Sequence, residues 1–258
     1  MSGGITHRRA FLPALAPLAL LAACSVVESG SDNQTDPSAA PAGGDALSSP
    51  VAGASPTDAA TPPAPPVPAE IAARTGELTA PDDFAMVMLY YSLTGLQPPI
   101  DKWVEDDMSV RTAAPADKAA ARDAVRARFA SGLQSVKDVG RLRITSNANL
   151  SDYDPSYGEY SVRVFAPSSS LIFNRSGERI HVKFDNAQAA QRWSVPTTEA
   201  QSIRDRIQYP SAVAVDALLQ ITGAAPERDG GTIRTRVISY ELKNNNSGTT
   251  IARVTVPQ

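Results

Sequence analysis

Apolar residues recur at helical spacing soon after residue 80. Four of them follow one another at positions i, i+3, i+4 and i+7, which is the pattern of a helix with one buried face. They are Phe84, Val87, Met88 and Tyr91. A capping segment at 79–82 precedes them, and Gly95 follows as a stop signal. The pattern predicts a helix that ends at Gly95.

Two further helices are expected before residue 140. The first follows Pro98 and Pro99, and its apolar side comprises Ile100, Trp103, Val104 and Met108. The second runs from about residue 115 to 138, with an apolar stripe of Val125, Phe129, Leu133 and Val136. Arg122 and Arg126 share the solvent face of this helix.

The remainder of the chain changes to alternation with a period of two, which predicts strands. The alternating segments are 141–145, 160–164, 180–185 and 213–221. A short helix is expected at 197–208, capped near Pro196. Turn signals at 229–231 and 244–248 separate two further strands, at 233–242 and 250–256. We therefore predict an α+β fold, with N-terminal helices packed on a mainly antiparallel sheet that ends in a three-stranded meander.

The first 23 residues have a different pattern. Arg8 and Arg9 carry the only full charges, and residues 11–23 contain no polar side chain. This run is shorter than the ~20 apolar residues of a transmembrane helix. A basic segment followed by a short apolar one is typical of an export signal peptide, which we assign to residues 1–23.

The end of this segment, Leu21-Ala22-Ala23-Cys24, resembles the lipobox of bacterial lipoproteins. The resemblance covers only about the first 24 residues. It implies that a diacylglycerol is attached to the sulfur of Cys24 and that the signal is cut before it. The new amino group is often acylated as well, typically with palmitate. Two or three acyl chains give a stable membrane anchor.

The sequence is compatible with two export routes. The segment His7-Arg8-Arg9-Ala10-Phe11-Leu12 resembles a twin-arginine signal, although His7 and Pro13 depart from the usual pattern. Arg8 and Arg9 also suit an ordinary secretory signal. Either route places the chain in the cell envelope, facing the periplasm or the cell surface. Ser25 favours the outer membrane if the cell is Gram-negative, because lipoproteins that resemble this one and stay in the inner membrane often carry Asp there.

Residues 24–70 have the composition of a disordered linker. They hold nine of the 21 prolines, no aromatic residue, no basic residue and six acidic ones. Such a segment buries too little apolar surface to offset its ordering entropy. We therefore predict a tether at 24–70 and a single folded domain at 71–258. That domain holds 22 basic and 21 acidic residues, so the acidity of the chain belongs to its tether.

Composition excludes several kinds of chemistry. A net charge of −3 argues against a nucleic-acid binder. With Cys24 lipidated and His181 the one histidine left after cleavage, neither a two-histidine zinc site nor a Cys–His pair is available within the chain. No Gly-x-Ser-x-Gly turn, phosphate loop or dinucleotide motif occurs. We expect no metal, no cofactor and no catalytic residue, and we interpret His181 as an ordinary residue on the polar face of a strand.

Two polar clusters remain to be interpreted. The acids Glu105, Asp106 and Asp107 are expected at a solvated helix end. The loop 152–159 fails as a calcium site, because Tyr157 and Arg163 occupy the positions where the EF-hand requires Gly and Glu. Tyr153 and Tyr157 in this loop are a candidate contact patch, since tyrosine is enriched at interfaces.

These observations predict a lipid-anchored envelope lipoprotein with a non-enzymatic binding or assembly role. Its expected partners are the membrane, through Cys24, and an envelope protein or glycan. The alternative is an envelope hydrolase that uses a pair of carboxylates, since such pairs are not recognisable from sequence.

Overall fold

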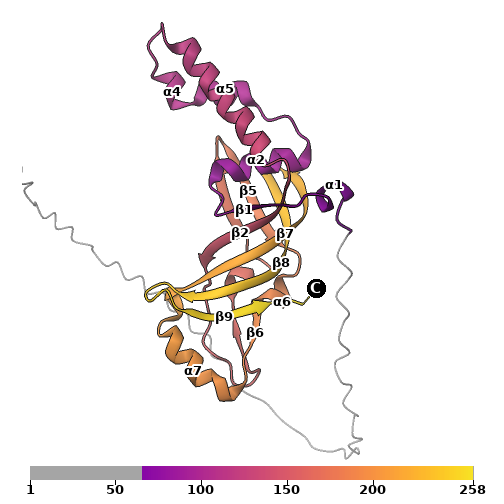
Figure 1. The fold of residues 1–258 in the computed structure, drawn as a ribbon, viewed down its shortest axis with the longest axis vertical. Coiled ribbons are helices and arrows are strands. Elements are labelled where there is room, and N and C mark those ends of the chain that lie inside the picture. Colours follow the sequence, from indigo (N-terminus) through magenta and orange to yellow (C-terminus); the bar gives the residue numbers. More distant parts are fainter. Residues whose placement is uncertain (1–65, 258) are drawn as a thin grey trace, which may run out of the picture. The chain divides into compact units, whose positions relative to one another are not determined.

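A sheet of seven strands forms the centre of the structure (Figure 1). The computed structural model describes residues 66–257, so the predicted signal peptide, the lipidation site and most of the tether lie outside the described residues. The strands of the sheet are β1 (Gly76–Thr79), β2 (Val139–Asn147), β4 (Leu171–Arg175), β5 (Glu178–Phe184), β7 (Val213–Glu227), β8 (Gly230–Asn244) and β9 (Thr250–Thr255).

The strand order is β1-β2-β7-β8-β5-β4, and β9 also pairs with β8. The first half of β8 pairs with β5 and its second half pairs with β9, so both strands share one edge of β8. β7, β8 and β9 form the predicted antiparallel meander. Two pairings, β1 with β2 and β5 with β8, are parallel, which the alternation pattern does not reveal.

Helices precede and interrupt this sheet. They are α1 (Ala69–Ala72), α2 (Asp83–Thr94), α3 (Ile100–Asp106), α4 (Met108–Arg111), α5 (Lys118–Ser135), α6 (Ala187–Gln191) and α7 (Thr197–Ile207). α2 packs on the sheet, and α3 and α5 pack beyond it, with α7 beside β9 at the other end (Figure 1). Helices on a mainly antiparallel sheet confirm the predicted α+β class.

α2 begins and ends where the sequence predicts. The side chain of Asp82 accepts a hydrogen bond from the Ala85 amide, and Gly95 ends the helix with a left-handed φ of 68°. The predicted single apolar face is incomplete, however, because every residue from Met86 to Tyr91 is buried. The sheet covers one side of α2 and α5 covers another, so a helix at this place needs apolar residues nearly all round.

A close contact fixes α2 on the sheet. The Tyr90 ring lies directly over Gly231 of β8, where a Cβ atom would come within 2.1 Å of the ring. The Tyr90 hydroxyl donates a hydrogen bond to the Gly230 carbonyl at 3.2 Å. Glycine at 231 is therefore required by packing, because only hydrogen leaves room for the ring.

Three local predictions differ from the structure. The second helix ends at Asp106, so Met108 starts α4 and is 66% exposed instead of lying on an apolar side. The alternation at 160–164 yields only the short strand β3 (Glu159–Ser161), which pairs with β6 (Arg192–Ser194) and is followed by a 3₁₀ turn at Arg163–Phe165. α1 begins at Ala69, inside the segment predicted to be a disordered tether, because Ile71 is buried in the core.

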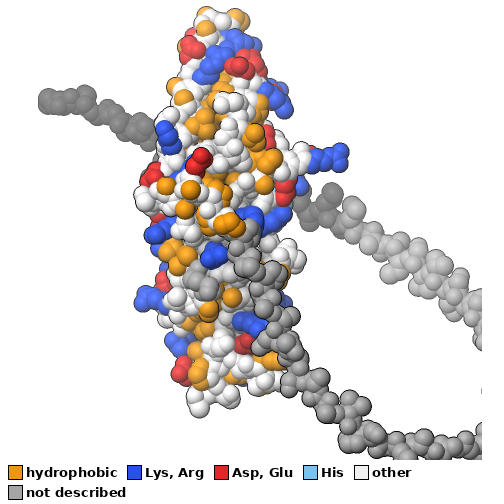
Figure 2. Space-filling view, turned by 90° about the vertical axis from the view of Figure 1, so that its right-hand side faces the viewer, with side chains coloured by type: hydrophobic (Ala, Val, Ile, Leu, Met, Phe, Trp, Pro, Cys, Tyr) orange, Lys and Arg blue, Asp and Glu red, His pale blue; other side chains and the backbone are white. Residues whose placement is uncertain are grey.

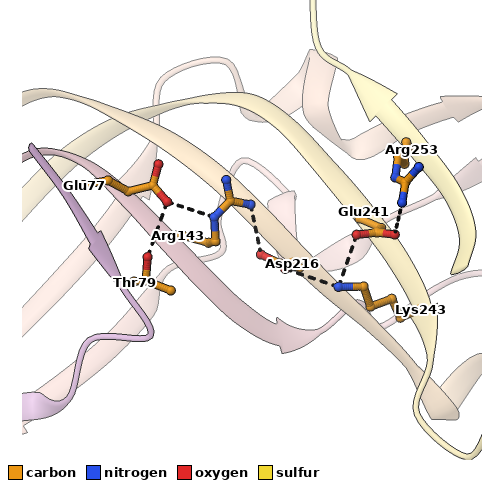
Figure 3. A network of polar contacts seen from close by, with 7 residues as sticks. All are labelled: Glu77, Thr79, Arg143, Asp216, Glu241, Lys243 and Arg253. Carbon is orange, nitrogen blue, oxygen red and sulfur yellow. Dashed lines mark hydrogen bonds and ion pairs between the residues drawn. The ribbon is translucent and has the colours of Figure 1, made fainter. Parts of the chain in front are cut away.

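Alternating charges cross the more exposed face of the sheet (Figure 3). Arg143 on β2 pairs with Glu77 on β1 at 2.9 Å and with Asp216 on β7 at 3.6 Å. Lys243 on β8 pairs with Asp216 at 3.4 Å and with Glu241 at 3.1 Å. Arg253 on β9 forms the last ion pair of this row, with Glu241 at 3.2 Å. Each charge has an opposite neighbour, so this row holds five strands together without presenting a field of one sign.

Candidate functional site

A pocket of about 350 Å³ lies between the C-terminal end of α7 and the segment that leads into β3. We call it the tyrosine pocket. Its lining residues come from two parts of the chain and are Ser151, Asp152, Tyr153, Tyr160, Arg204, Ile207, Gln208 and Pro210. Its volume is in the range of small-molecule sites.

Three aromatic rings pack together beside this pocket, and two of them, Tyr153 and Tyr160, line it. The centroids of Tyr153 and Tyr160 are 5.2 Å apart, and those of Tyr160 and Trp193 are 5.0 Å apart. Tyr160 on β3 and Trp193 on β6 face each other in the strand register. The Tyr153 hydroxyl donates a hydrogen bond to the Val195 carbonyl at 3.1 Å. The rings are thereby held in fixed positions and mainly contact one another.

The hydroxyl of Tyr160 is buried near the Arg204 guanidinium. This side chain is 2% exposed, yet its Oη atom is buried without a hydrogen-bond partner among the described residues. Burial raises the pKa of Tyr160, and the nearby Arg204 guanidinium partly opposes that rise. The hydroxyl and the guanidinium therefore form one polar group at the pocket wall.

Further polar side chains surround the pocket without being used by the fold. Within the described part of the chain, Arg204 forms no ion pair, and the side chains of Asp152 and Gln208 accept or donate no hydrogen bond. Asp152 and Arg204 carry opposite charges, but they do not pair with each other. The pocket thus presents a cation, an anion and an amide to solvent.

The backbone is strained at Gln208. This residue has φ 57° and ψ −62°, and the Tyr209 amide donates to the Ile207 carbonyl at 2.6 Å across it. A γ-turn of this hand is rare and unfavourable for a residue with a side chain. Strain of this kind concentrates at binding and active sites. Here it places Gln208 on the pocket wall.

A second cavity, of about 420 Å³, lies between α1, the end of α2 and the irregular part of β7. We call it the groove. Two acids line it, Glu70 and Asp185. Asp185 accepts hydrogen bonds from the Thr222 hydroxyl at 2.6 Å and from Arg234 at 2.8 Å. Its carboxylate is therefore ion-paired, with a partner on each oxygen.

The predicted contact tyrosines lie in different environments. Tyr157 is 78% exposed, whereas Tyr153 is half-buried and packs in the aromatic stack. Tyr153 lines the tyrosine pocket and Tyr157 does not. The export residues Arg8, Arg9, Leu21, Ala22 and Ala23 and the lipidation residue Cys24 lie outside the described residues.

His181 lies on β5 with its Nδ1 atom 3.2 Å from the Ser170 hydroxyl. Both side chains are half-buried, and neither lines the tyrosine pocket or the groove. The contact joins β5 to the segment just before β4.

The acids at the end of α3 hold neighbouring helices together. Glu105 pairs with Arg122 of α5 at 2.7 Å, and Asp107 pairs with Arg128 of α5 at the same distance. Over the described residues, no cluster of three or more His, Cys, Asp or Glu side chains is arranged to bind a metal ion. Nor does any helix there have the length and apolarity needed to cross a bilayer.

Sequence reasoning missed the residues that complete the pocket. Tyr160 was assigned to the core by its alternation, and Arg204 and Gln208 have no motif around them. Comparison with protein families, with curated proteins and with solved structures finds no match for this chain.

Proposed function

We propose that this chain is a lipid-anchored lipoprotein of the cell envelope whose folded part binds a ligand or partner without catalysing a reaction. Anchoring rests on the lipobox-like residues Leu21 to Cys24. The observation that carries binding is the tyrosine pocket, which is lined by Arg204 and Asp152, two opposite charges without an ion pair among the described residues. The outer membrane is the expected location in a Gram-negative cell, with the folded part facing the periplasm or the cell surface.

The charge distribution is compatible with attachment through lipid. The region beyond the tether is nearly neutral. On the face in Figure 2, hydrophobic and charged side chains are interspersed, and neither basic nor acidic side chains form one large field. A protein held at a membrane by acyl chains needs no basic surface to bind it.

A carboxylate hydrolase is the second candidate, and one observation favours it. Glu70 and Asp185 line the same cavity. Both oxygens of Asp185 are already engaged, one by Arg234 and the other by Thr222, which leaves this carboxylate less free to contact a substrate. The hydrolase predicts that Glu70→Gln and Asp185→Asn each abolish cleavage of envelope polymers by the purified protein. The binding role predicts no cleavage by wild type in the same assay.

Site-specific crosslinking in intact cells tests the binding role. A photoreactive amino acid replaces Tyr157 or Tyr209, which are 78% and 65% exposed and adjoin the tyrosine pocket in sequence. Met108 on α4, 66% exposed, is the matched control, because it is equally accessible and belongs to another part of the fold. We expect one adduct shared by positions 157 and 209 and absent at 108. Equal adducts at all three positions, or none, would contradict a specific binding role.

A further inference from the structure

We infer that the tyrosine pocket binds the head of an α-amino acid, that is, a free amino group and a carboxylate on one carbon atom. This inference rests on the proposed binding function and names the ligand class of the same site. It follows from the identity and position of the polar groups that surround the pocket.

The two charged residues supply complementary partners for such a ligand. The Arg204 guanidinium is a planar donor that suits a carboxylate, and the Asp152 carboxylate suits an ammonium group. Neither has an ion pair among the described residues, although they line one pocket of about 350 Å³. Both side chains are exposed at one cavity, so a ligand that carries both charges can contact the two of them at once.

The position of α7 strengthens this choice. The pocket lies at the C-terminal end of the helix, where Ile207 and Gln208 form part of its wall. The C-terminal end of a helix has partial negative charge, which adds to the attraction of Asp152 for an ammonium group. The Arg204 guanidinium also interacts with the buried Tyr160 hydroxyl, which holds the guanidinium at the wall of the pocket.

The aromatic residues argue against a sugar as the ligand. Sugars are generally bound on the face of an exposed ring, but Tyr160 is 2% exposed and its ring stacks between Tyr153 and Trp193. Ile207 and Pro210 instead offer an apolar wall for a short aliphatic side chain. A small amino-acid head with an aliphatic part therefore fits the lining better than a saccharide does.

Ligand titration of the full-length lipoprotein in detergent micelles, followed by NMR, tests this inference. The probes are alanine, alanine amide, N-acetylalanine, Nε-acetyl-lysine and N-acetylglucosamine. We expect alanine to bind and both blocked alanines to bind about tenfold or more weakly, because each loses one charged contact. Alanine stands for a free amino acid, whereas Nε-acetyl-lysine stands for the same head group at the end of a longer molecule. Tighter binding of alanine would identify a free amino acid as the ligand, and tighter binding of Nε-acetyl-lysine would identify the end of a longer molecule.

Three variants and one control test which side chains of the pocket contact the ligand. Arg204→Gln and Asp152→Asn are each expected to weaken alanine binding about tenfold or more, whereas Arg192→Gln, on β6 outside the pocket, should leave it unchanged. Tyr160→Phe should also weaken alanine binding, because it removes the hydroxyl that interacts with the Arg204 guanidinium at the pocket wall. A lower midpoint with unchanged binding would show a merely structural role for this hydroxyl and overturn its place in the site.

The remaining outcomes separate the inference from the proposed function. Binding of N-acetylglucosamine but not of alanine or Nε-acetyl-lysine overturns the amino-acid assignment and leaves the binding role intact. Equal affinity for alanine and its two blocked forms also overturns it. If no probe binds, the inference fails, and the crosslinking experiment at Tyr157 and Tyr209 then decides separately whether the pocket region has any partner.

Discussion

At the scale of single residues, the contacts that matter most join positions far apart in the sequence. Tyr90 and Gly231 form the tightest of these, since the ring of one occupies the space that a side chain of the other would need. Gly132 of α5 similarly faces the Phe84 ring, at 2.7 Å from an added Cβ atom. Small residues at these places allow aromatic rings to fill the interface between helix and sheet.

Gly231→Ala is therefore expected to destabilise the protein by about 2 kcal/mol or more, because the new methyl group would force the Tyr90 ring and α2 away from β8. Gly223→Ala on β7 is the control, since no atom lies within 4 Å of the added Cβ. Its effect should be within about 0.5 kcal/mol. Urea unfolding followed by circular dichroism measures both, and a Gly231→Ala effect no larger than that of the control would show that the contact tolerates a side chain.

At the scale of elements, Asp107 links α3, α4 and α5. Its side chain accepts a hydrogen bond from the Ser109 amide, which caps α4, and it pairs with Arg128 of α5 at 2.7 Å. The Arg128 guanidinium in turn lies over the Phe129 ring at 5.5 Å. One carboxylate thus fixes the start of a short helix and ties it to a longer one.

The pH dependence of this link follows from its pKa. Hydrogen bonds from Ser109 and Arg128 lower the pKa of Asp107 to about 2 from an ordinary value of 3.8. Because the pKa is lower in the folded state, the stabilisation is complete above about pH 4 and is lost as the pH falls to about 2.

We expect Asp107→Ala to cost about 1–2 kcal/mol of unfolding free energy at pH 7 and much less near pH 2. Asp106→Ala, which removes a neighbouring exposed acid with no contact among the described residues, is the control. Chemical unfolding of both variants across this pH range provides the measurement. A cost that stayed constant down to pH 2 would contradict the role of the ionised carboxylate.

At the scale of the whole molecule, the expected organisation is a folded part joined by a tether to a lipid anchor. Within the described residues, 66–257, the first helix begins at Ala69, slightly earlier than composition indicates. The proposed lipid anchor depends on one sulfur atom, because Cys24 is the only cysteine in the chain.

Cys24→Ala is expected to move the protein from the membrane fraction to the soluble periplasmic or secreted fraction, because no acyl chain can then be attached. Fractionation of cells that express wild type or variant, followed by immunoblotting, measures this. Ser25→Ala next to it is the control, and should leave the protein in the membrane fraction. Equal recovery of Cys24→Ala and wild type with the membranes would refute anchoring through this residue.

The sequence by itself determined the features that depend on near neighbours. Helix spacing and caps located α2, and alternation located β5, β7, β8 and β9, because these signals involve residues only a few positions apart. The same local pattern indicates that one side of an element is buried but not what covers it. For that reason α2 was expected to have one apolar face, although the sheet and α5 enclose it.

The tertiary structure alone decided the parallel pairings and the tyrosine pocket. Gly76 of β1 pairs with Val139 of β2, and Ile180 of β5 pairs with Gly231 of β8, so both parallel pairings join strands that are far apart in the sequence. The pocket joins residues 151–160 to residues 204–210, and the hydrogen bond from Tyr153 to Val195 that holds one wall spans 42 positions. An unused hydroxyl or an unpaired charge is defined by its surroundings in three dimensions, and these arise only when the chain packs.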